Sequence, residues 1–379
     1  MKIALVAPLE RPVPPTKYGS IERIIYFIAD LLSQRGHQID LFASGDSKKG
    51  VNYKLVPSLQ TSILSDASLT GGAHAQRIME HIGISNTIKY INDSGYDIIN
   101  NHSLSFVPFS QLIRDYTHKV VHSHHGILSL NGVKQLCLKY RDLYHVSLSF
   151  NQRKGLSALN FLANIYNGVD LTFFPYQEHK ADQYGHMIFI GRIDAEKDPI
   201  AAIKAAIYTQ KKLLVAAKTP ENDAYFSQFA HFSRSDFIAF LGEIEHESIR
   251  NYLSSAKLLL MPVQCEDACP VAPLEAMASG TPVVAFARGA LPEQIRDGVT
   301  GFLVNQSEEH VQGDWIIKKT GVDGLREAIE RIYALSEEEY IAMRRACRSH
   351  VQHKFSREKM IDEYEELYTE IVQRNILRR

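Results

Sequence analysis

Short apolar runs alternate with helix-like patterns along the whole chain, and this alternation limits the folds that the chain can adopt. An apolar run at residues 1–7 predicts a buried parallel strand, and a helix is predicted over about 20–35, closed by Gly36. The residues that give this helix one apolar face are Ile21, Ile24, Ile25, Ile28, Leu31 and Leu32. Further strands are expected at residues 39–43, 98–99, 119–122, 144–147 and 164–166. Strand, helix and strand in series favour a doubly wound parallel sheet.

The same pattern restarts near residue 187. A second set of strands is expected at residues 187–190, 212–216, 237–240, 258–262 and 282–285. Residues 167–185 resemble a hinge, and 379 residues exceed the usual size of a single core. We therefore expect an α/β protein with two Rossmann-like domains, 1–172 and 173–356, that bind ligands beyond the carboxyl ends of their strands. The first strand is not followed by G-x-G-x-x-G, which argues against a dinucleotide-dependent dehydrogenase.

The charge balance argues against some classes of partner. The chain carries 42 Lys and Arg against 43 Asp and Glu, a formal net charge of −1. Such a balance creates no long-range field that attracts a polyanion, so we expect no nucleic-acid partner.

The sequence also predicts a compartment. No run approaches the roughly 20 apolar residues that cross a bilayer. The four cysteines show no spacing typical of zinc sites, so we expect no metal there and free thiols in a reducing cytoplasm. The basic tail at 374–379 would permit peripheral contact with the inner face of a membrane, although a solvated helix end explains it better.

The most informative segment runs from Pro262 to Val284. An apolar strand ends there in an acidic loop, and a helix starting near Val271 carries Glu275 in its first turns. Amides at a helix start favour an anion such as a diphosphate, and a carboxylate one turn further in is placed to accept the hydroxyls of a ribose. An ordinary strand-loop-helix unit, whose acids complement the helix dipole, would explain Glu275 alone but not the whole segment.

An acid followed by seven residues and Glu275, and then by residues 276–284, closely resembles glycosyltransferase family 4, the glycosyl transferases group 1. The resemblance continues through 289–293 and 297–304 and covers nearly the full length. Members are retaining nucleotide-sugar enzymes of GT-B architecture. The resemblance thus implies two Rossmann-like domains that face a cleft, with the C-terminal helix at 357–379 packing back on the first domain.

Carried over, the resemblance assigns roles around this helix. Glu275 would bind the ribose, and Asp267 would contact the donor sugar. Members usually have Glu at the position of Asp267, and the adjacent Glu266 could compensate for the shorter side chain. Pro270 stands where members commonly have glycine, and proline cannot donate an amide hydrogen. The other residues expected to bind the nucleotide here are Cys269, Val271 and Ala272.

A second motif spans residues 189–198. A strand delivers Gly191 and Arg192, and Lys197 follows five residues later. A guanidinium fork and an ammonium group suit a leaving diphosphate, although isolated basic residues in a loop are more often solvated surface charges. In the family that it resembles, the motif grips the donor phosphates, so we expect Arg192 and Lys197 to bind the donor and assist catalysis.

The loop at residues 12–22 leads into the first helix. Gly19 would let the backbone approach a phosphate closely. A tight turn with a helix cap at Ser20 is the alternative, and taken alone it would be favoured. Members usually have two glycines here, and Ser20 replaces the second, so the resemblance assigns Gly19 and Ser20 to the donor site.

Histidines cluster after an expected strand, in His122-Ser123-His124-His125-Gly126. The resemblance assigns His125 to the pocket for donor sugar and acceptor, with His124 as the second choice. His102, at the end of the preceding strand, is a weaker candidate because a histidine there is more often structural. No carboxylate partner for a metal site is evident beside the cluster.

Two further assignments rest on resemblance. The loop Gly242, Glu243 and Ile244 would lie against the nucleobase. Lys218 would line the nucleotide site.

The sequence therefore predicts a metal-independent retaining glycosyltransferase with a front-face mechanism. Its donor would be a nucleotide diphosphate sugar, with UDP slightly favoured over GDP, and its acceptor a hydroxyl of a glycan, lipid or small metabolite. Alternatives are a sugar-nucleotide epimerase or a phosphorylase on the same architecture. A catalytically silent sugar-nucleotide or glycan-binding scaffold is a third, to which Asp267, Pro270 and Ser20 give weight.

Overall fold

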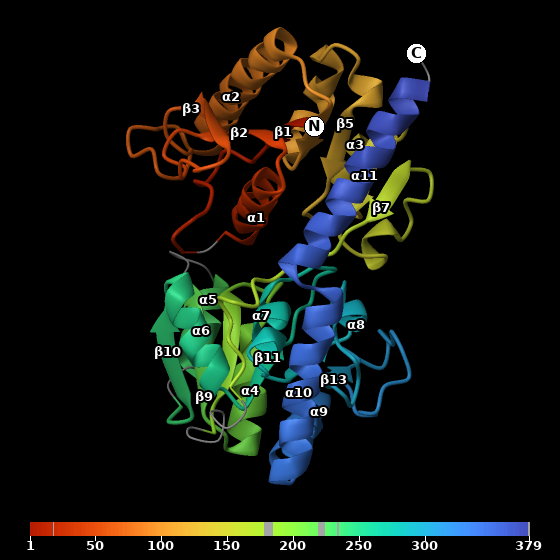
Figure 1. The fold of residues 1–379 in the computed structure, drawn as a ribbon. Coiled ribbons are helices and arrows are strands. Elements are labelled where there is room, and N and C mark those ends of the chain that lie inside the picture. The colour runs from red at the N-terminus through yellow and green to blue at the C-terminus, as the bar shows by residue number, and fades with distance from the viewer. Residues whose placement is uncertain (18, 178–184, 219–223, 233–234, 378–379) are drawn as a thin grey trace. The chain divides into compact units, whose positions relative to one another are not determined.

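The computed structural model describes residues 1–17, 19–177, 185–218, 224–232 and 235–377 (Figure 1). The chain divides into two compact units. Unit 1 comprises Met1–Tyr166 and Glu358–Arg379, and unit 2 comprises Asn167–Arg357. The predicted boundary at 172 thus lies a few residues inside unit 2, and residues 178–184 of the predicted hinge lie outside the described part.

Unit 1 is built on a parallel seven-stranded sheet with the order β3-β2-β1-β4-β5-β6-β7. Its strands are β1 (Lys2–Val6), β2 (Gln38–Ser44), β3 (Lys54–Leu59), β4 (Ile98–Asn101), β5 (Val120–Ser123), β6 (Tyr144–Ser147) and β7 (Phe161–Asn164). Its helices are α1 (Ser20–Gln34), α2 (Gly72–Ser94), α3 (Asn131–Lys139), the 3-10 helices η1 (Leu104–Leu112), η2 (Tyr116–His118) and η3 (Asn151–Arg153), and α11 (Arg357–Leu377). The strand order reverses between β1 and β4, which is where ligands bind in such sheets.

Unit 2 repeats the plan with a parallel six-stranded sheet in the order β10-β9-β8-β11-β12-β13. Its strands are β8 (Met187–Arg192), β9 (Leu213–Lys218), β10 (Ile238–Gly242), β11 (Leu258–Met261), β12 (Val283–Phe286) and β13 (Gly301–Val304). Its helices are α4 (Pro199–Thr209), α5 (Ala224–Phe232), α6 (His246–Ser255), α7 (Ala272–Ala278), α8 (Leu291–Gln294), α9 (Gly321–Ala334) and α10 (Glu337–Lys354). Here the reversal lies between β8 and β11.

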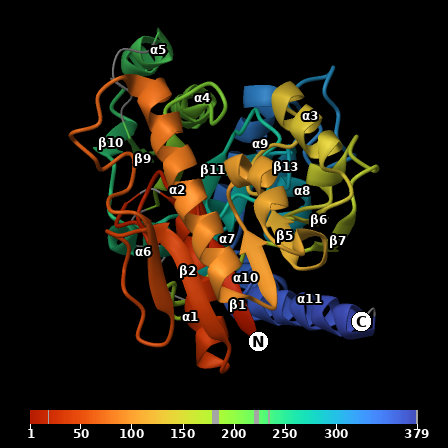
Figure 2. The ribbon, with the colours of Figure 1, turned by 90° about the horizontal axis from the view of Figure 1, so that it is seen from above.

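Helices cover the sheets as their apolar faces require. In unit 1, α2 lies over β1 to β3, and Ile84, Ile88 and Ile91 pack against strand residues such as Phe42 (Figure 1, Figure 2). The predicted face of α1 is largely confirmed, since Ile24, Ile25, Ile28 and Leu32 are buried, and Gly36 adopts φ 87° beyond the helix end. In unit 2, α4 and α9 share one core with β8 and β9. Among the described residues, no helix combines the length and the apolar character needed to cross a membrane.

Three strands differ from the expectation. β3 was not predicted, and it contains Pro57, which a strand tolerates at the edge of a sheet where β3 lies. β7 ends at Asn164, whereas the strand was expected at 164–166. The apolar run around these residues has no clear period, so its pattern did not show where the strand begins. β13 was not predicted either, because its four residues are too short to show a period.

The last helix completes the core of unit 1. Tyr368 is fully buried and accepts a hydrogen bond from the Asn100 side chain at 2.5 Å, and Tyr364 donates to the Ser123 hydroxyl at 3.1 Å. At the surface, Arg35 forms ion pairs with α11 residues Asp362 and Glu365. The segment after residue 357 therefore belongs structurally with the first 166 residues.

Candidate active site

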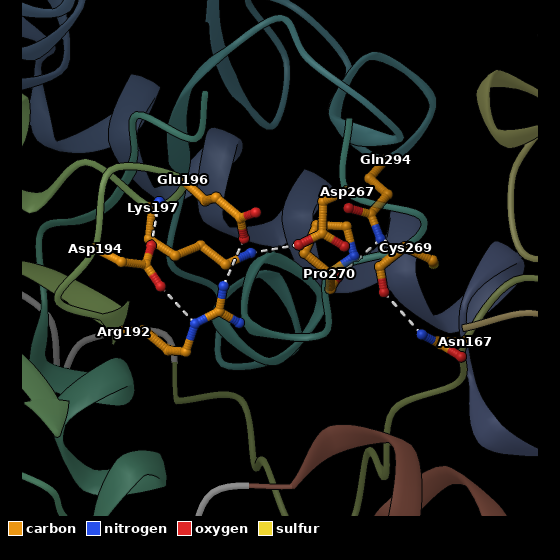
Figure 3. A network of polar contacts seen from close by, with 9 residues as sticks. All are labelled: Asn167, Arg192, Asp194, Glu196, Lys197, Asp267, Cys269, Pro270 and Gln294. Carbon is orange, nitrogen blue, oxygen red and sulfur yellow. Dashed lines mark hydrogen bonds and ion pairs between the residues drawn. The ribbon is translucent and has the colours of Figure 1, made fainter. Parts of the chain in front are cut away.

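The carboxyl edge of the unit 2 sheet gathers the charged residues that the sequence singled out. β11 runs beside β8, with Leu258 opposite Met187. Because both strands are parallel, the turn after Arg192 and the loop after Met261 emerge at the same edge. Figure 3 shows Arg192 and Lys197 on one side of this region and Asp267 facing them.

Arg192 is held by two carboxylates of its own turn. Its Nε donates to Asp194 at 2.6 Å, and its Nη2 donates to Glu196 at 2.7 Å. The side chain keeps 41% of its surface exposed, so the guanidinium remains accessible to an anion. The two carboxylates orient the guanidinium group and leave it partly exposed (Figure 3).

Lys197 is far less exposed and is paired with Asp267 across the two loops. Its side chain is 14% exposed, and its Nζ donates to Asp267 Oδ2 (Figure 3). Burial by itself would lower the pKa of Lys197, but the charge of Asp267 and the hydrogen bond to it outweigh burial and raise the pKa. Lys197 therefore carries a positive charge at neutral pH, and Arg192 and Lys197 form the pair of cations that the second motif predicted.

Glu266 is engaged within its own loop. Its Oε1 lies 3.0 Å from Arg288 Nε, and its Oε2 accepts from the Gly289 amide at 3.0 Å. Both oxygens thus hold the loop after β12 against the loop after β11. Compensation by Glu266 for the shorter Asp267 at a donor sugar stays a prediction, and it would require Glu266 to leave one of these two contacts.

Gly289 fixes the backbone of Asp267. It adopts φ 56°, and a Cβ added there would lie 2.4 Å from Asp267 O and 2.5 Å from Asp267 N. The Ala290 amide also donates to Asp267 O at 3.0 Å. Side chains cannot relieve this contact because both crowded atoms are backbone.

Replacing Gly289 by alanine should therefore displace Asp267 and Lys197 and lower turnover by about tenfold to a hundredfold, as expected for catalytic groups moved by an ångström or so. Steady-state rates and the melting temperature measure the effect. Gly95→Ala is the matched control, because Gly95 also has positive φ (63°) but has open space around its Cβ position. If Gly289→Ala costs no more activity than Gly95→Ala, the contact does not position the site.

The turn before α7 is fixed by two side-chain amides. Asn167 donates to Cys269 O at 2.7 Å, and Gln294 donates to Pro270 O at 2.9 Å (Figure 3). The Cys269 side chain is buried, and burial raises the pKa of its thiol to about 12. The helix begins at Ala272, next to the predicted start at Val271, which is its N-cap residue. Contacts from Cys269 to a nucleotide would have to use its backbone.

Glu275 lies in the first turn of α7 and has a partner that the sequence did not reveal. Its Oε1 accepts from His246 Nε2 at 2.9 Å. His246 is the first residue of α6 and stacks on Phe173, with ring centroids 4.7 Å apart. The loop assigned to the nucleobase begins at Gly242, and His246 stands four residues after that glycine. This position was the available sign that His246 lies near the nucleotide site.

Lys218 and the Gly242 loop lie at the same edge of the sheet. Lys218 ends β9, is exposed, and stands in register with Arg192 on β8. Gly242 ends the neighbouring β10 with φ 70°, and Glu243 and Ile244 are partly exposed. Their contact with a nucleobase stays a prediction.

In unit 1 the cap expected as an alternative at Ser20 is wrong. Gly19 occupies the N-cap position of α1, and Ser20 is the first helical residue. Gly19 has φ 149°, and an added Cβ would lie 2.6 Å from Pro15 Cγ and 2.8 Å from Glu22 Oε2. Packing therefore requires a glycine at this position, whether or not an anion approaches it.

The histidines form hydrogen-bonded pairs between neighbouring strands. His102 follows β4 and His125 follows β5, and their rings are joined from His102 Nδ1 to His125 Nε2 at 2.8 Å. His124 instead contacts His145 on β6, a partner that the sequence did not reveal, at 2.8 Å. Burial lowers the pKa of His125 to about 4, so it is neutral near pH 7. His124 and the weaker candidate His102 are both buried, and His102 directly contacts His125.

Comparison with known proteins gives a family match within unit 2. Residues 172–339 match the family described as Glycosyl transferases group 1. The D-inositol 3-phosphate glycosyltransferase of Mycobacterium sp. (strain JLS) is 33% identical over 165 residues, 40% of this chain and 37% of that protein. The same-named protein of Mycobacterium tuberculosis (strain F11) is 30% identical over 165 residues, 40% of this chain and 34% of its own length. The alignment thus spans little more than a third of these relatives.

Solved structures match over both units. Sucrose-phosphate synthase from Thermosynechococcus elongatus has a TM-score of 0.78 at 19% identity and covers 98% of each chain. Anabaena HepE in complex with UDP and glucose has a TM-score of 0.70 at 16% identity, covering 98% of this chain and 100% of that one. The catalytic domain of starch synthase IV from Arabidopsis thaliana, bound to ADP and acarbose, has a TM-score of 0.73 at 15% identity, covering 98% and 99%.

These likenesses confirm the predicted fold class, which is α/β of GT-B type with two Rossmann-like parallel-sheet units. Residues 172–339, which contain Arg192, Lys197, Asp267 and Glu275, are similar in sequence to the glycosyl transferases group 1.

Proposed function

We propose that the protein is a retaining glycosyltransferase that moves a sugar from a nucleotide diphosphate to an acceptor hydroxyl without a metal ion. The observation that carries the proposal is that two cations, Arg192 and Lys197, lie at the switch point of the unit 2 sheet. A leaving diphosphate needs such positive charge. The family match of residues 172–339 supports sugar transfer as the reaction class.

Three groups of residues would bind the phosphates, the ribose and the base of the donor. Arg192 and Lys197 bind the phosphates, and a phosphate oxygen would replace Asp194 or Glu196 at the guanidinium. Glu275 accepts the ribose hydroxyls, and the loop 242–244 with Lys218 faces the base. UDP is our preferred nucleotide over GDP, because HepE was solved with UDP and glucose, although starch synthase IV carries ADP.

In the proposed reaction the bond between the anomeric carbon and the phosphate oxygen breaks as the acceptor hydroxyl attacks from the same face. The charge that develops on the departing phosphate is neutralised by Arg192 and Lys197, and the acceptor proton passes to that phosphate oxygen. Asp267 contacts the donor sugar beside Lys197. Within unit 1, burial lowers the pKa of His125 to about 4, so a neutral His125 would act by hydrogen bonding and add no charge.

The acceptor belongs to the class of hydroxyl-bearing glycans, lipids and small metabolites. The four cysteines are free thiols, which is typical of a reducing compartment, and we propose the cytoplasm, with the basic tail available for the inner face of a membrane.

The proposal is tested with Arg192→Ala and Glu275→Ala proteins. Each should bind UDP about a hundredfold more weakly by calorimetry, since a charge-assisted contact is lost in each. Release of UDP from UDP-glucose, and of GDP from GDP-mannose, gives the turnover. Arg326→Ala is the control, because Arg326 also pairs with a glutamate four residues on but lies in α9. Full donor binding and turnover in both variants would refute the proposal.

Product analysis separates the alternative reactions. Labelled sugar on an acceptor with unchanged anomeric configuration, read by NMR, supports a retaining transferase. Epimerisation would leave the nucleotide attached to the sugar, and phosphorolysis would consume phosphate. Binding without any turnover over a broad acceptor panel would indicate a scaffold.

A further inference from the structure

His246 is built into the ribose-binding part of the proposed donor site. Its Nε2 lies 2.9 Å from Glu275 Oε1, and both side chains are largely buried, at 13% and 9% exposure. Twenty-nine positions separate them in the sequence, so the contact depends on the packing of α6 against α7. Three residues after the end of α7, Thr281 donates to Leu253 O of α6 at 2.6 Å and ties the two segments together.

The imidazole ring itself is held on two sides by aromatic residues. Phe173 stacks on it with an interplanar angle of 12°, and Phe174 meets it edge-on at 88°. Arg250, one turn further along α6, places its guanidinium 5.3 Å from the Phe173 ring. A ring fixed in this way can present its N–H group in one direction only.

Glu275 needs such a partner because a carboxylate must meet two adjacent hydroxyls at once. The terminal torsion of a glutamate is broad, so a nearly buried Glu275 without a fixed donor would sample several orientations. The hydrogen bond to His246 fixes the carboxylate plane and uses one lone pair of Oε1. The rest of Oε1 and all of Oε2 stay available to accept from ribose hydroxyls.

We propose that His246 is a positioning residue that orients the Glu275 carboxylate for the 2′- and 3′-hydroxyls of the donor ribose. His246 also begins α6 directly after the 242–245 loop, so it links the loop assigned to the base with the carboxylate assigned to the ribose. The inference rests on the proposed function, because it presupposes a nucleotide donor.

The experiment compares three probes on the intact protein: UDP, 2′,3′-dideoxy-UDP and pyrophosphate, by calorimetry. His246→Phe keeps the aromatic stack but removes the N–H donor, and should weaken UDP binding about tenfold, the loss of one hydrogen bond to a charged group. Binding of the dideoxy nucleotide and of pyrophosphate should stay unchanged. His246→Gln retains an N–H group at a similar reach and should restore part of the UDP affinity. His353→Phe, the same substitution in α10, should change none of the three.

A double-mutant comparison adds a readout that a merely structural role would not move. In a Glu275→Gln background, which alone weakens UDP binding, His246→Phe should have almost no further effect, because the two residues act as one unit. Equal weakening of all three probes, or additive effects in the double variant, would overturn the role of His246. If wild-type protein binds UDP no better than the dideoxy form, the assignment of Glu275 to the ribose is wrong and the role of His246 falls with it. If it binds no nucleotide at all, the proposed function itself fails.

Discussion

Replacing Lys197 by methionine will lower turnover by about two to three orders of magnitude, the usual cost of removing one preorganised group that stabilises transition-state charge. Methionine preserves much of the length and apolar stem of lysine, so the loss isolates the ammonium group. Asp267 would keep its negative charge without its partner at a side chain only 22% exposed. We therefore also expect a fall of about 1 kcal/mol in the free energy of unfolding.

Two further variants separate pairing from catalysis. In Lys197→Met/Asp267→Asn the unpaired charge is removed, so the free energy of unfolding should recover while turnover stays low. Lys318→Met removes an exposed lysine that pairs with Asp314 and should change neither quantity measurably. If the double variant regains turnover along with stability, Lys197 serves only to neutralise Asp267, and its role toward the diphosphate is refuted.

Acidification from pH 6.5 to about pH 4 will destabilise unit 1 more than unit 2, where burial also lowers the pKa values of His186 and His350. Burial lowers the pKa of His122 to about 3 and that of His125 to about 4. The unfolded chain, with histidine pKa values near 6.5, binds more protons than the native unit in this range, so stability is complete above about pH 6.5 and is lost as the pH falls. The loss of stability from His122 and His125 therefore grows steadily as the pH falls below about 6.5.

Hydrogen exchange measures the loss of stability in each unit separately. Peptides from residues 98–125 should lose more protection between pH 6.5 and 4, after correction for the intrinsic exchange rate, than peptides from 199–209 in unit 2. His122→Asn offers an acceptor to the Asn101 side chain, which contacts His122 at 2.9 Å, and cannot be protonated in this range. The pH dependence should therefore be shallower in that variant. Equal loss of protection in both units would mean that carboxylates, rather than these histidines, govern the acid response.

The sequence predicted most strands of both sheets because these strands are buried apolar runs between helical patterns. It failed where the signal was short or broken, as at Pro57 in the edge strand β3 and in the four-residue β13. Such strands are defined by pairing with a neighbour, since β13 aligns with β12 along its whole length. Local pattern does not encode that pairing.

For the candidate site too, the sequence located some residues and missed others. Arg192, Lys197, Asp267 and Glu275 could be located because they stand in motifs with fixed spacing, although no comparison tests their individual roles. Their partners could not be predicted, because the contact from Lys197 to Asp267 spans 70 residues and that from His246 to Glu275 spans 29. The pairing of His124 with His145 depends likewise on the register of β5 beside β6. Contacts between distant segments follow from strand order and helix packing, which a single sequence does not specify.

The return of α11 to unit 1 bears on the order of events during synthesis. The ribosome completes residues 167–357, all of unit 2, before it makes the helix whose Tyr364 and Tyr368 fill the core beside Ser123 and Asn100. The unit translated first is therefore the one finished last, and its partly formed sheet must wait through the whole production of unit 2 with an apolar surface uncovered. A released chain that ends at residue 357 should accordingly bind holding chaperones through its first 166 residues, whereas unit 2 should be folded.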